Sequence, residues 1–301
     1  MAEDTTRKAL DAKAYEALIK KERRANSAWN KLRRNKSAML GLIIAVLLVI
    51  MAVFSPLIAT HDPNEQSIAD AYKKPCEDGH IFGTDEYGRD LFSRIVYGSR
   101  ISIIVAVGST LVGGAIGLVI GLIAGYNGGV IDSVNMRFID AMSAFPYILL
   151  SILLMTIMGT GLVNVTFAIG FCSVPGYARI VRGQVHIVKN KEFCNAIRVL
   201  GASNARLITR HILPNVISQV IVYSTLSIAG AITFEATLSY LGLGISPPTA
   251  SWGTILCGGR ECLRSAPHIA TISGLFILIT VVGFNILGDG IRDVLDPKMK
   301  R

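Results

Sequence analysis

Charge is scarce in this sequence. Only 17% of its 301 residues are Asp, Glu, Lys or Arg, whereas a soluble domain usually carries about a quarter. Apolar residues make up 51% of the chain, and the mean hydropathy is +0.49. These values exclude an ordinary soluble domain and predict a polytopic membrane protein. The net charge of +9 does not indicate a nucleic-acid partner, because the basic residues lie beside apolar segments, as in membrane proteins.

Motifs for catalysis are also lacking. The sequence contains no G-x-x-x-x-G-K-[ST] loop, no G-x-S-x-G turn and no H-E-x-x-H pair. The five histidines are scattered, at His61, His80, His186, His211 and His268. We therefore expect that this chain is not an enzyme, binds no nucleotide and carries no cofactor.

Cysteine is infrequent, and its spacing does not suit zinc. The five cysteines are Cys76, Cys172, Cys194, Cys257 and Cys262, with no C-x-x-C among them. Cys257 and Cys262 fall in a predicted outer loop, where they either pair or remain free thiols. We assign no metal site. A secretory signal is not expected, because 37 mostly polar residues precede the first apolar run.

Long apolar runs are abundant. A helix needs about 20 apolar residues to cross the hydrocarbon core, and six segments predict an all-α protein with six transmembrane helices. The segments are 38–59, 101–125, 141–160, 161–178, 216–234 and 266–287. The fourth is short and contains Pro175, and its boundary with the third is the least well defined.

The distribution of Lys and Arg predicts the orientation. Residues 1–37 contain 11 basic and 5 acidic residues, whereas 61–98 contain 4 basic and 8 acidic ones. Because cytoplasmic loops carry the excess of basic residues, we expect both chain termini to be cytoplasmic. This gives a basic N-terminal segment (1–37), a first span with an external loop (38–100), a five-helix core (101–290) and a C-terminal tail (291–301). Residues 8–36 form either an amphipathic helix on the lipid surface or a solvated tail.

Small residues recur at every fourth position of the second span, at Gly113, Gly117, Gly121 and Gly125. Such a stripe permits two helices to approach closely in lipid. Either this face packs tightly on another helix, or the glycines reflect the general enrichment of glycine in membrane helices.

Two carboxylates lie near the apolar spans, where burial of a charge is costly. Glu235, near the outer end of the fifth span, either faces the substrate path or is a hydrogen-bonded structural carboxylate. Asp140, at the entry of the third span, is expected to pair with Arg137. We find no ionisable residue at mid-membrane depth, and this disfavours a proton-coupled secondary transporter.

Residues 189–214 form a basic, polar segment between apolar runs, here called the basic island. Its first half predicts a helix with an apolar stripe, consisting of Phe193, Ala196, Ile197 and Leu200. Gly201 should end this helix, Ser203 should cap a second one, and Pro214 should lie in the first turn of the next span. The island is therefore expected to be a docking site at one face of the membrane.

Four blocks of sequence resemble one family. Residues 82–100, FGTDEYGRDLFSRIVYGSR, are similar to the F-G-T-D-x-x-G-R-D block of peptide-transporter permeases. The basic island resembles the E-A-A loop of ABC-importer permeases. ISPPTASWG (245–253) and GDGIRDVLDPKMKR at the C-terminus resemble further blocks of the same group, closest to its C-type subunit.

The resemblance implies a type I ABC-importer permease fold and an ATP-driven importer of dipeptides or oligopeptides in the bacterial inner membrane. It implies a second, related permease, two P-loop ATPases that hold ATP and Mg, and an extracytoplasmic substrate-binding protein. Permeases of similar design also serve nickel and oligosaccharides, so those substrates stay open.

The resemblance also implies site residues. Alignment on Gly201 places Asn195 where the family has glutamate, and Glu192 lies one turn earlier on the same face. The residues expected to couple to the ATPases are Glu192, Asn195, Ala196, Arg198, Gly201, Leu213 and Pro214. The external block is Gly83, Thr84, Asp85, Gly88, Arg89 and Asp90. The cluster Asp85, Arg89, Asp90, Arg94 and Arg100 either forms an ion-paired cap over the pore mouth or contacts a partner protein.

Overall fold

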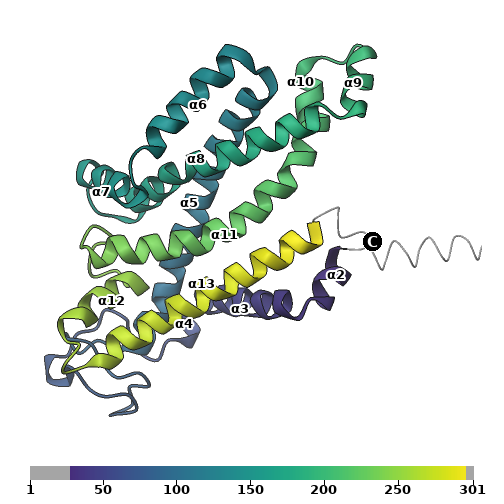
Figure 1. Cartoon of the computed structure of the whole chain (residues 1–301). Helices are drawn as coiled ribbons and strands as arrows, with labels where there is room; N and C mark the ends of the chain where they lie inside the picture. Colours follow the sequence, from purple (N-terminus) through teal and green to yellow (C-terminus); the bar gives the residue numbers. More distant parts are fainter. Residues whose placement is uncertain (1–27, 296–301) are drawn as a thin grey trace, which may run out of the picture.

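A computed structural model describes residues 28–295 as a bundle of helices (Figure 1). The elements are α2 (Ala28–Arg34), α3 (Lys36–Val53), α4 (Ser55–Ile58), η1 (Ile68–Asp70), α5 (Leu91–Asn127), α6 (Gly129–Ser143), α7 (Tyr147–Met158), α8 (Leu162–Lys189), α9 (Glu192–Val199), α10 (Asn204–Leu207), η2 (Ile208–Ile212), α11 (Leu213–Tyr240), α12 (Trp252–Glu261) and α13 (Pro267–Leu295). The β contacts of these residues are two isolated bridges, so the all-α prediction is confirmed. Residues 1–27 and 296–301, which include most of the 8–36 segment and the end of the tail, lie outside the described part.

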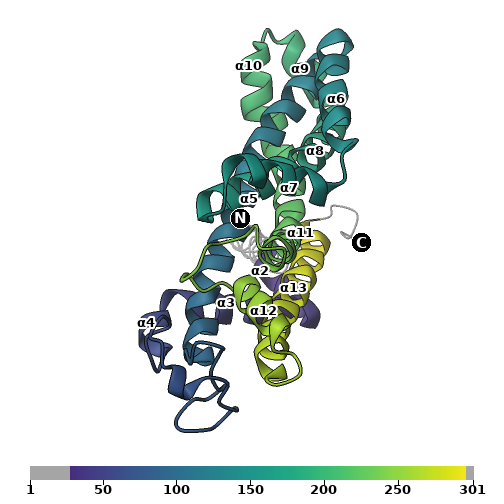
Figure 2. The same ribbon diagram turned by 90° about the vertical axis from the view of Figure 1, so that its left-hand side faces the viewer.

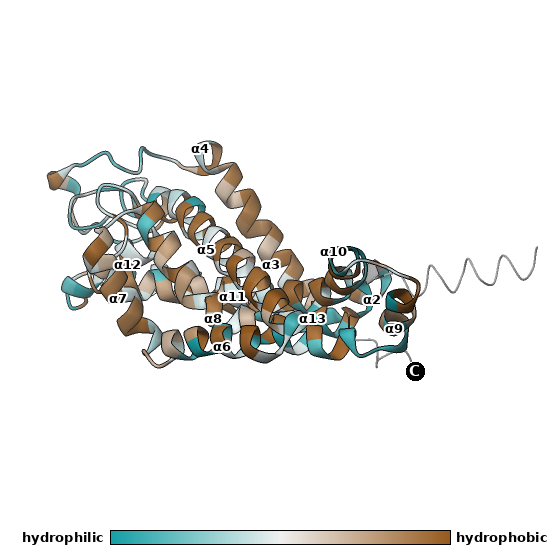
Figure 3. Ribbon diagram, turned by 90° about the horizontal axis from the view of Figure 1, so that it is seen from above, coloured by the Kyte–Doolittle hydropathy of each residue, from teal (hydrophilic) through white to brown (hydrophobic). Residues whose placement is uncertain are grey.

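Four helices are long and apolar enough to cross a membrane: α3, α5, the continuous helix α10–η2–α11, and α13. They carry large apolar side chains on their outer surfaces, such as Leu47 (58% exposed) and Leu111 (65% exposed). Apolar faces of this extent suit contact with lipid rather than water. Figure 3 shows these apolar helices between more polar segments at the two ends of the bundle.

The third predicted span is not one straight helix. α6 ends at Ser143 and α7 begins at Tyr147, and the two helices are bent by 86° at the break. The prediction of a single helix over 141–160 is wrong because Pro146 disfavours helical backbone at Phe145. α6 and α7 together form a broken span or a re-entrant loop.

The fourth predicted span lies in α8 but extends further than expected. α8 runs to Lys189, eleven residues beyond the predicted end at 178, and Pro175 lies inside it. The extension carries Arg179 and Arg182, whose guanidinium groups bind carboxylates of α6. Apolarity alone could not predict this part of the helix.

The glycine stripe of α5 lies against α8. A Cβ atom on Gly117 would lie 2.4 Å from Cβ of Tyr177, and one on Gly121 would lie 2.6 Å from Cβ of Val181. Gly113 and Gly125 approach Ser173 and Val185 of the same helix. The two backbones are therefore in close contact along about three helical turns, inside this chain.

The helix ends gather into two groups. Figure 1 places α2, α9, α10 and the end of α13 toward one end of the bundle, and α4, α12 and the loop before α5 toward the other. Figure 2 shows α9 and α10 far from the loop before α5 when the molecule is seen from the side. The basic island and the acidic loop thus lie at opposite ends.

Candidate functional site

Local capping defines the first helix of the basic island. α9 starts at Glu192 and is closed by Gly201 in left-handed backbone, φ +84°. The amide of Gly201 donates to the carbonyl of Arg198 (3.0 Å), and the amide of Ala202 donates to that of Ile197 (3.3 Å). This pair of bonds is the Schellman motif, which favours glycine at its left-handed position. The second helix begins as predicted, with Ser203 Oγ accepting from the amide of Arg206.

The island exposes much of its apolar surface. Leu200 is 86% exposed and Val199 88%, at the turn between α9 and α10. Cys194 faces inward and is fully buried, and Ile197 is half-buried beside it. Of the predicted stripe, Phe193, Ala196 and Leu200 are exposed, whereas Ile197 packs on the protein itself.

The polar positions of the island also face outward. Asn195, Glu192 and Arg198 are exposed on α9. Pro214 is exposed at the start of α11, next to half-buried Leu213. The residues expected to couple to an ATPase therefore share an accessible end of the molecule, although Leu213 turns partly inward.

The island is fastened to the end of α5 by side chains that the sequence did not single out. The Tyr126 hydroxyl donates to Asn204 Oδ1 (2.6 Å), and Lys189 Nζ donates to the carbonyl of Gly125 (2.8 Å). The ammonium group of Lys189 thereby caps the carboxyl end of α5, where the helix dipole favours a cation. Side-chain hydrogen bonds therefore connect the island to the end of α5.

At the opposite end, residues 60–94 fold into what we call the cap segment. Its centre is Asp85, whose Oδ2 lies 2.7 Å from Arg89 Nε and 3.4 Å from Arg94 Nε. All three side chains are less than a tenth exposed. Asp85 Oδ1 accepts from the amides of Tyr87 and Arg89, and Arg94 donates to the carbonyl of Pro63. Part of the predicted charge cluster is thus a buried structural network.

The rest of that cluster differs from the prediction. Arg100 is exposed on α5 and does not join the Asp85 network in the described residues. The Asp90 carboxylate forms no ion pair with an arginine of the described residues; it caps α5 and lies beside His61 and His80. Because these contacts depend on how the loop folds back, the spacing of charges along the sequence could not assign them.

Two glycines of the FGTD block allow the loop to pack closely. Gly83 and Gly88 have φ of +80° and +71°, and a Cβ atom on Gly88 would lie 1.7 Å from the carbonyl oxygen of Ser67. Thr84 is fully buried and accepts from the amide of Lys73 while donating to the carbonyl of Asp70. The block therefore holds the chain segments of the cap together.

Glu235 is fully buried in α11. Its Oε1 accepts from Ser239 Oγ (2.9 Å) and from Ser251 Oγ (2.8 Å), and Ser251 caps α12. The carboxylate thus joins α11 to α12 and does not line the large cavities among the described residues. This geometry favours the structural alternative.

Two other expectations are corrected or resolved. Asp140 binds Arg179 (3.1 Å) and not Arg137, because α8 extends alongside α6. Cys257 and Cys262 are both free thiols, so the alternative of a bridge between them is not realised.

One cavity lies in the described part of the bundle at the α6–α7 bend, and another lies at its outer end. The first, of about 540 Å³, is formed by the α6–α7 bend, α8 and α11, and its lining includes Tyr147, Ser173, Tyr223 and Ser227 but no charged residue. The second, of about 800 Å³, lies at the outer end between the cap segment and α12, and includes Arg89 and Glu86. The inner cavity is thus lined without charge, whereas the outer one carries charged side chains.

The fold defines a class of protein. The structure aligns with an inward-facing form of the MetNI methionine ABC transporter at a TM-score of 0.56 and 18% identity, over 68% of this chain and 98% of that one. The chain thus has the fold of an ABC-importer permease.

Sequence comparison then gives the family. Residues 117–301 match the binding-protein-dependent transport system inner membrane component, and 25–75 match the N-terminal transmembrane domain of oligopeptide transport permease C. The chain is 44% identical to the dipeptide permease DppC of Bacillus subtilis (strain 168), over 91% of this chain and 86% of DppC. It is 43% identical to the oligopeptide permease OppC of the same organism, over 90% and 88%. The chain belongs to the inner membrane components of binding-protein-dependent transport systems and is a multi-pass inner membrane protein.

Proposed function

We propose that this chain forms half of the translocation pore of an ATP-driven importer of dipeptides or oligopeptides. The observation that carries the proposal is the exposed apolar turn at Val199 and Leu200, which lies at the same end as both described chain ends. In water such a surface favours a protein partner. Because this chain has no nucleotide-binding loop, the proposed partners at the island are two cytoplasmic ATPases.

Two further partners are proposed, one within the membrane and one at the outer end of the molecule. A second, related permease completes the pore, and a substrate-binding protein delivers cargo at the cap segment. Both termini lie in the cytoplasm, in agreement with the basic residues near α2 and α9. Closure of the ATPases moves the island, and its contacts with α5 carry the movement into the membrane.

Peptide is favoured over nickel by the inner cavity. Transition-metal cations need imidazole, thiolate or carboxylate ligands, whereas the lining has one cysteine, Cys172, and no histidine or acidic residue. Tyrosine and serine hydroxyl groups suit the amide and terminal groups of a short peptide. The names of the relatives, dipeptide and oligopeptide permeases, point to the same substrate class.

The coupling role is tested with Gly201→Leu in the complete transporter, reconstituted in proteoliposomes. We expect uptake to fall at least tenfold while ATP hydrolysis continues without stimulation by substrate. Gly129→Leu is the matched control, because Gly129 also has positive φ (+55°) and open space around its missing side chain. If Gly201→Leu retained both uptake and stimulated hydrolysis, the island would not be the coupling site.

The substrate class is tested separately by uptake of labelled dipeptide, labelled pentapeptide and nickel ions by the same proteoliposomes with their binding protein. We expect peptide uptake that depends on ATP. Uptake of nickel without peptide uptake would contradict the proposal but leave the coupling role intact.

A further inference from the structure

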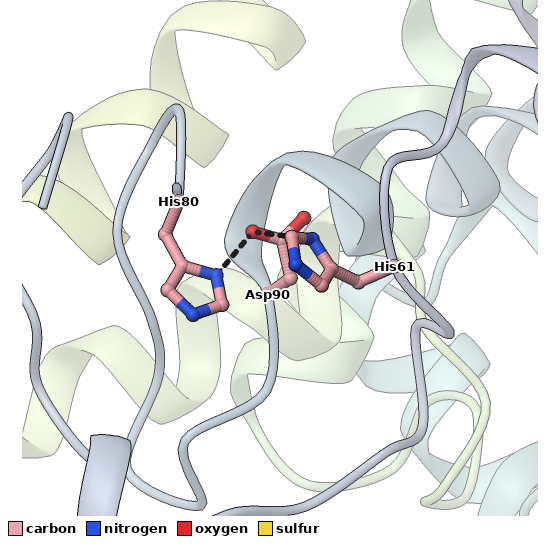
Figure 4. A group of neighbouring side chains, drawn as sticks. All are labelled: His61, His80 and Asp90. Atoms are coloured by element: carbon pink, nitrogen blue, oxygen red, sulfur yellow. Dashed lines mark hydrogen bonds and ion pairs between the residues drawn. The ribbon is translucent and has the colours of Figure 1, made fainter. Parts of the chain in front are cut away.

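Two histidines and one aspartate, His61, His80 and Asp90, meet in the cap segment. His61 follows α4, His80 lies in the loop before the FGTD block, and Asp90 caps α5. Figure 4 shows the three side chains converging from these separate segments. One ligand atom from each lies within 4.8 Å of the other two.

The two oxygens of Asp90 have different partners. Oδ2 accepts from the amide of Ser93 (2.8 Å), which fixes the carboxylate, and lies 3.4 Å from the Thr60 hydroxyl, whose oxygen is also 3.0 Å from His61 Nδ1. Oδ1 points to the histidines, 2.9 Å from His80 Nδ1 and 3.7 Å from His61 Nδ1. The carboxylate therefore keeps one oxygen for the helix cap and presents the other to both imidazoles.

The spacing fits a bound cation. Zinc binds nitrogen and oxygen at about 2.0–2.2 Å, so ligand atoms in a tetrahedral site lie roughly 3.4 Å apart. The distances of 2.9 and 3.7 Å lie on either side of this value. The largest separation within the group reaches 4.8 Å, so the two imidazole rings must move toward each other by about 1 Å to complete a tetrahedral site.

The surroundings also suit a metal ion. Asp90 is fully buried and His80 nearly so, whereas the His61 side chain is 39% exposed and gives access from the outer solvent. The Ser93 amide and the Thr60 hydroxyl contact the Asp90 oxygen that faces away from the histidines. Hydrogen bonds of this kind orient the ligands in metal sites. Two imidazoles and one carboxylate are ligands that zinc takes readily, with water in the fourth position.

We propose that His61, His80 and Asp90 form a zinc site in the outer cap of this permease. The ion is bound through Nδ1 of each histidine, with the ring proton on Nε2, and through Oδ1 of Asp90. It joins the segment after α4, the loop around His80 and the start of α5, and so stabilises the cap. The inner cavity, which lacks such ligands, does not share this site.

The test uses the complete transporter, purified through a tag without histidine and stripped of metal with a chelator. Zn²⁺ is titrated in competition with a chromophoric chelator. We expect one tight site per copy of this chain, and at least about a hundredfold weaker binding in His61→Gln and in His80→Gln. His211→Gln, at the opposite end of the molecule, should bind zinc as the unaltered protein does.

Two further measurements separate metal binding from folding. Zn²⁺ should raise the thermal unfolding temperature of the unaltered protein but not that of His61→Gln, whose side chain is the most exposed of the three. Asp90→Asn preserves a capping oxygen for α5 yet removes the charged ligand, and it should also weaken zinc binding.

Equal zinc affinity in the unaltered protein and both histidine variants would overturn the proposal, as would the absence of binding at 1 mM Zn²⁺. Neither result would affect the proposed import function.

Discussion

The cap segment and the basic island differ in what they bury. The cap encloses Asp85, Arg89 and Arg94 in a network with little exposure, whereas the island leaves Val199 and Leu200 almost fully exposed. Buried ion pairs need every partner in place, because a remaining single charge is costly. Exposed apolar side chains cost stability in water and are retained where another protein covers them. The contrast indicates that the centre of the cap is held by its own ion pairs, whereas the apolar turn of the island is suited to a protein partner.

Glycine substitution should reveal the contrast most strongly. Gly88→Ala adds left-handed strain and a Cβ atom 1.7 Å from a carbonyl oxygen, so we expect a loss of about 5 kcal/mol in stability. Gly201→Ala adds only the strain and should cost about 1 kcal/mol. Thermal unfolding in detergent compares the two variants. Similar losses of stability in Gly88→Ala and Gly201→Ala would contradict the close packing of Gly88 against Ser67.

The Asp85 network should be the next most sensitive. Asp85→Ala leaves two buried guanidinium groups without their carboxylate, and we expect a loss of about 4 kcal/mol. Glu192→Ala, on the exposed face of α9, should change stability by less than about 0.5 kcal/mol. Denaturation of both variants tests this difference, and a mild effect of Asp85→Ala would mean that the network is hydrated.

Substitution of Glu235, which lies outside both the cap segment and the basic island, should have a smaller effect on stability. Glu235→Ala leaves two buried serine hydroxyls without an acceptor and should cost about 2 kcal/mol, whereas Glu235→Gln retains the acceptor oxygen and should cost less. Uptake by the folded Gln variant should remain normal. A stable Gln variant with lost uptake would instead place Glu235 in the substrate path.

The smallest expected effect on stability is at the contact between the basic island and α5. Tyr126→Phe removes one exposed hydrogen bond to Asn204 and should cost about 0.5 kcal/mol. Because this bond joins the island to α5, uptake should fall more than stability does. Measurement of both quantities in one preparation checks this, with Tyr97→Phe as a hydroxyl control. Uptake that remained normal would show that Lys189 alone carries the connection.

Features that depend on local sequence were predictable. The end of α9 at Gly201 and the start of α10 at Ser203 follow from capping rules that involve only a few neighbouring residues. The glycine stripe of α5 could be recognised from its spacing, although the sequence did not identify α8 as the helix it contacts.

Features that depend on contacts between distant segments were not predictable. The pairing of Asp140 with Arg179 requires the extension of α8, which the low apolarity beyond residue 178 concealed. His61, His80 and Asp90 have no regular spacing, and only the folding of the loop brings them together. Pro146 was a visible signal for the α6–α7 bend, but the continuous apolar run over 141–160 outweighed it.

The unbroken helix from Asn204 to Tyr240 has a mechanical consequence. Its 37 residues, at about 1.5 Å per residue, follow a path of roughly 55 Å that bends within α11 (Figure 1). One end emerges from the basic island, and the other is tied through Glu235 to the cap of α12. A single run of hydrogen-bonded backbone therefore joins the basic island to α12, so the two ends of the bundle are not mechanically independent.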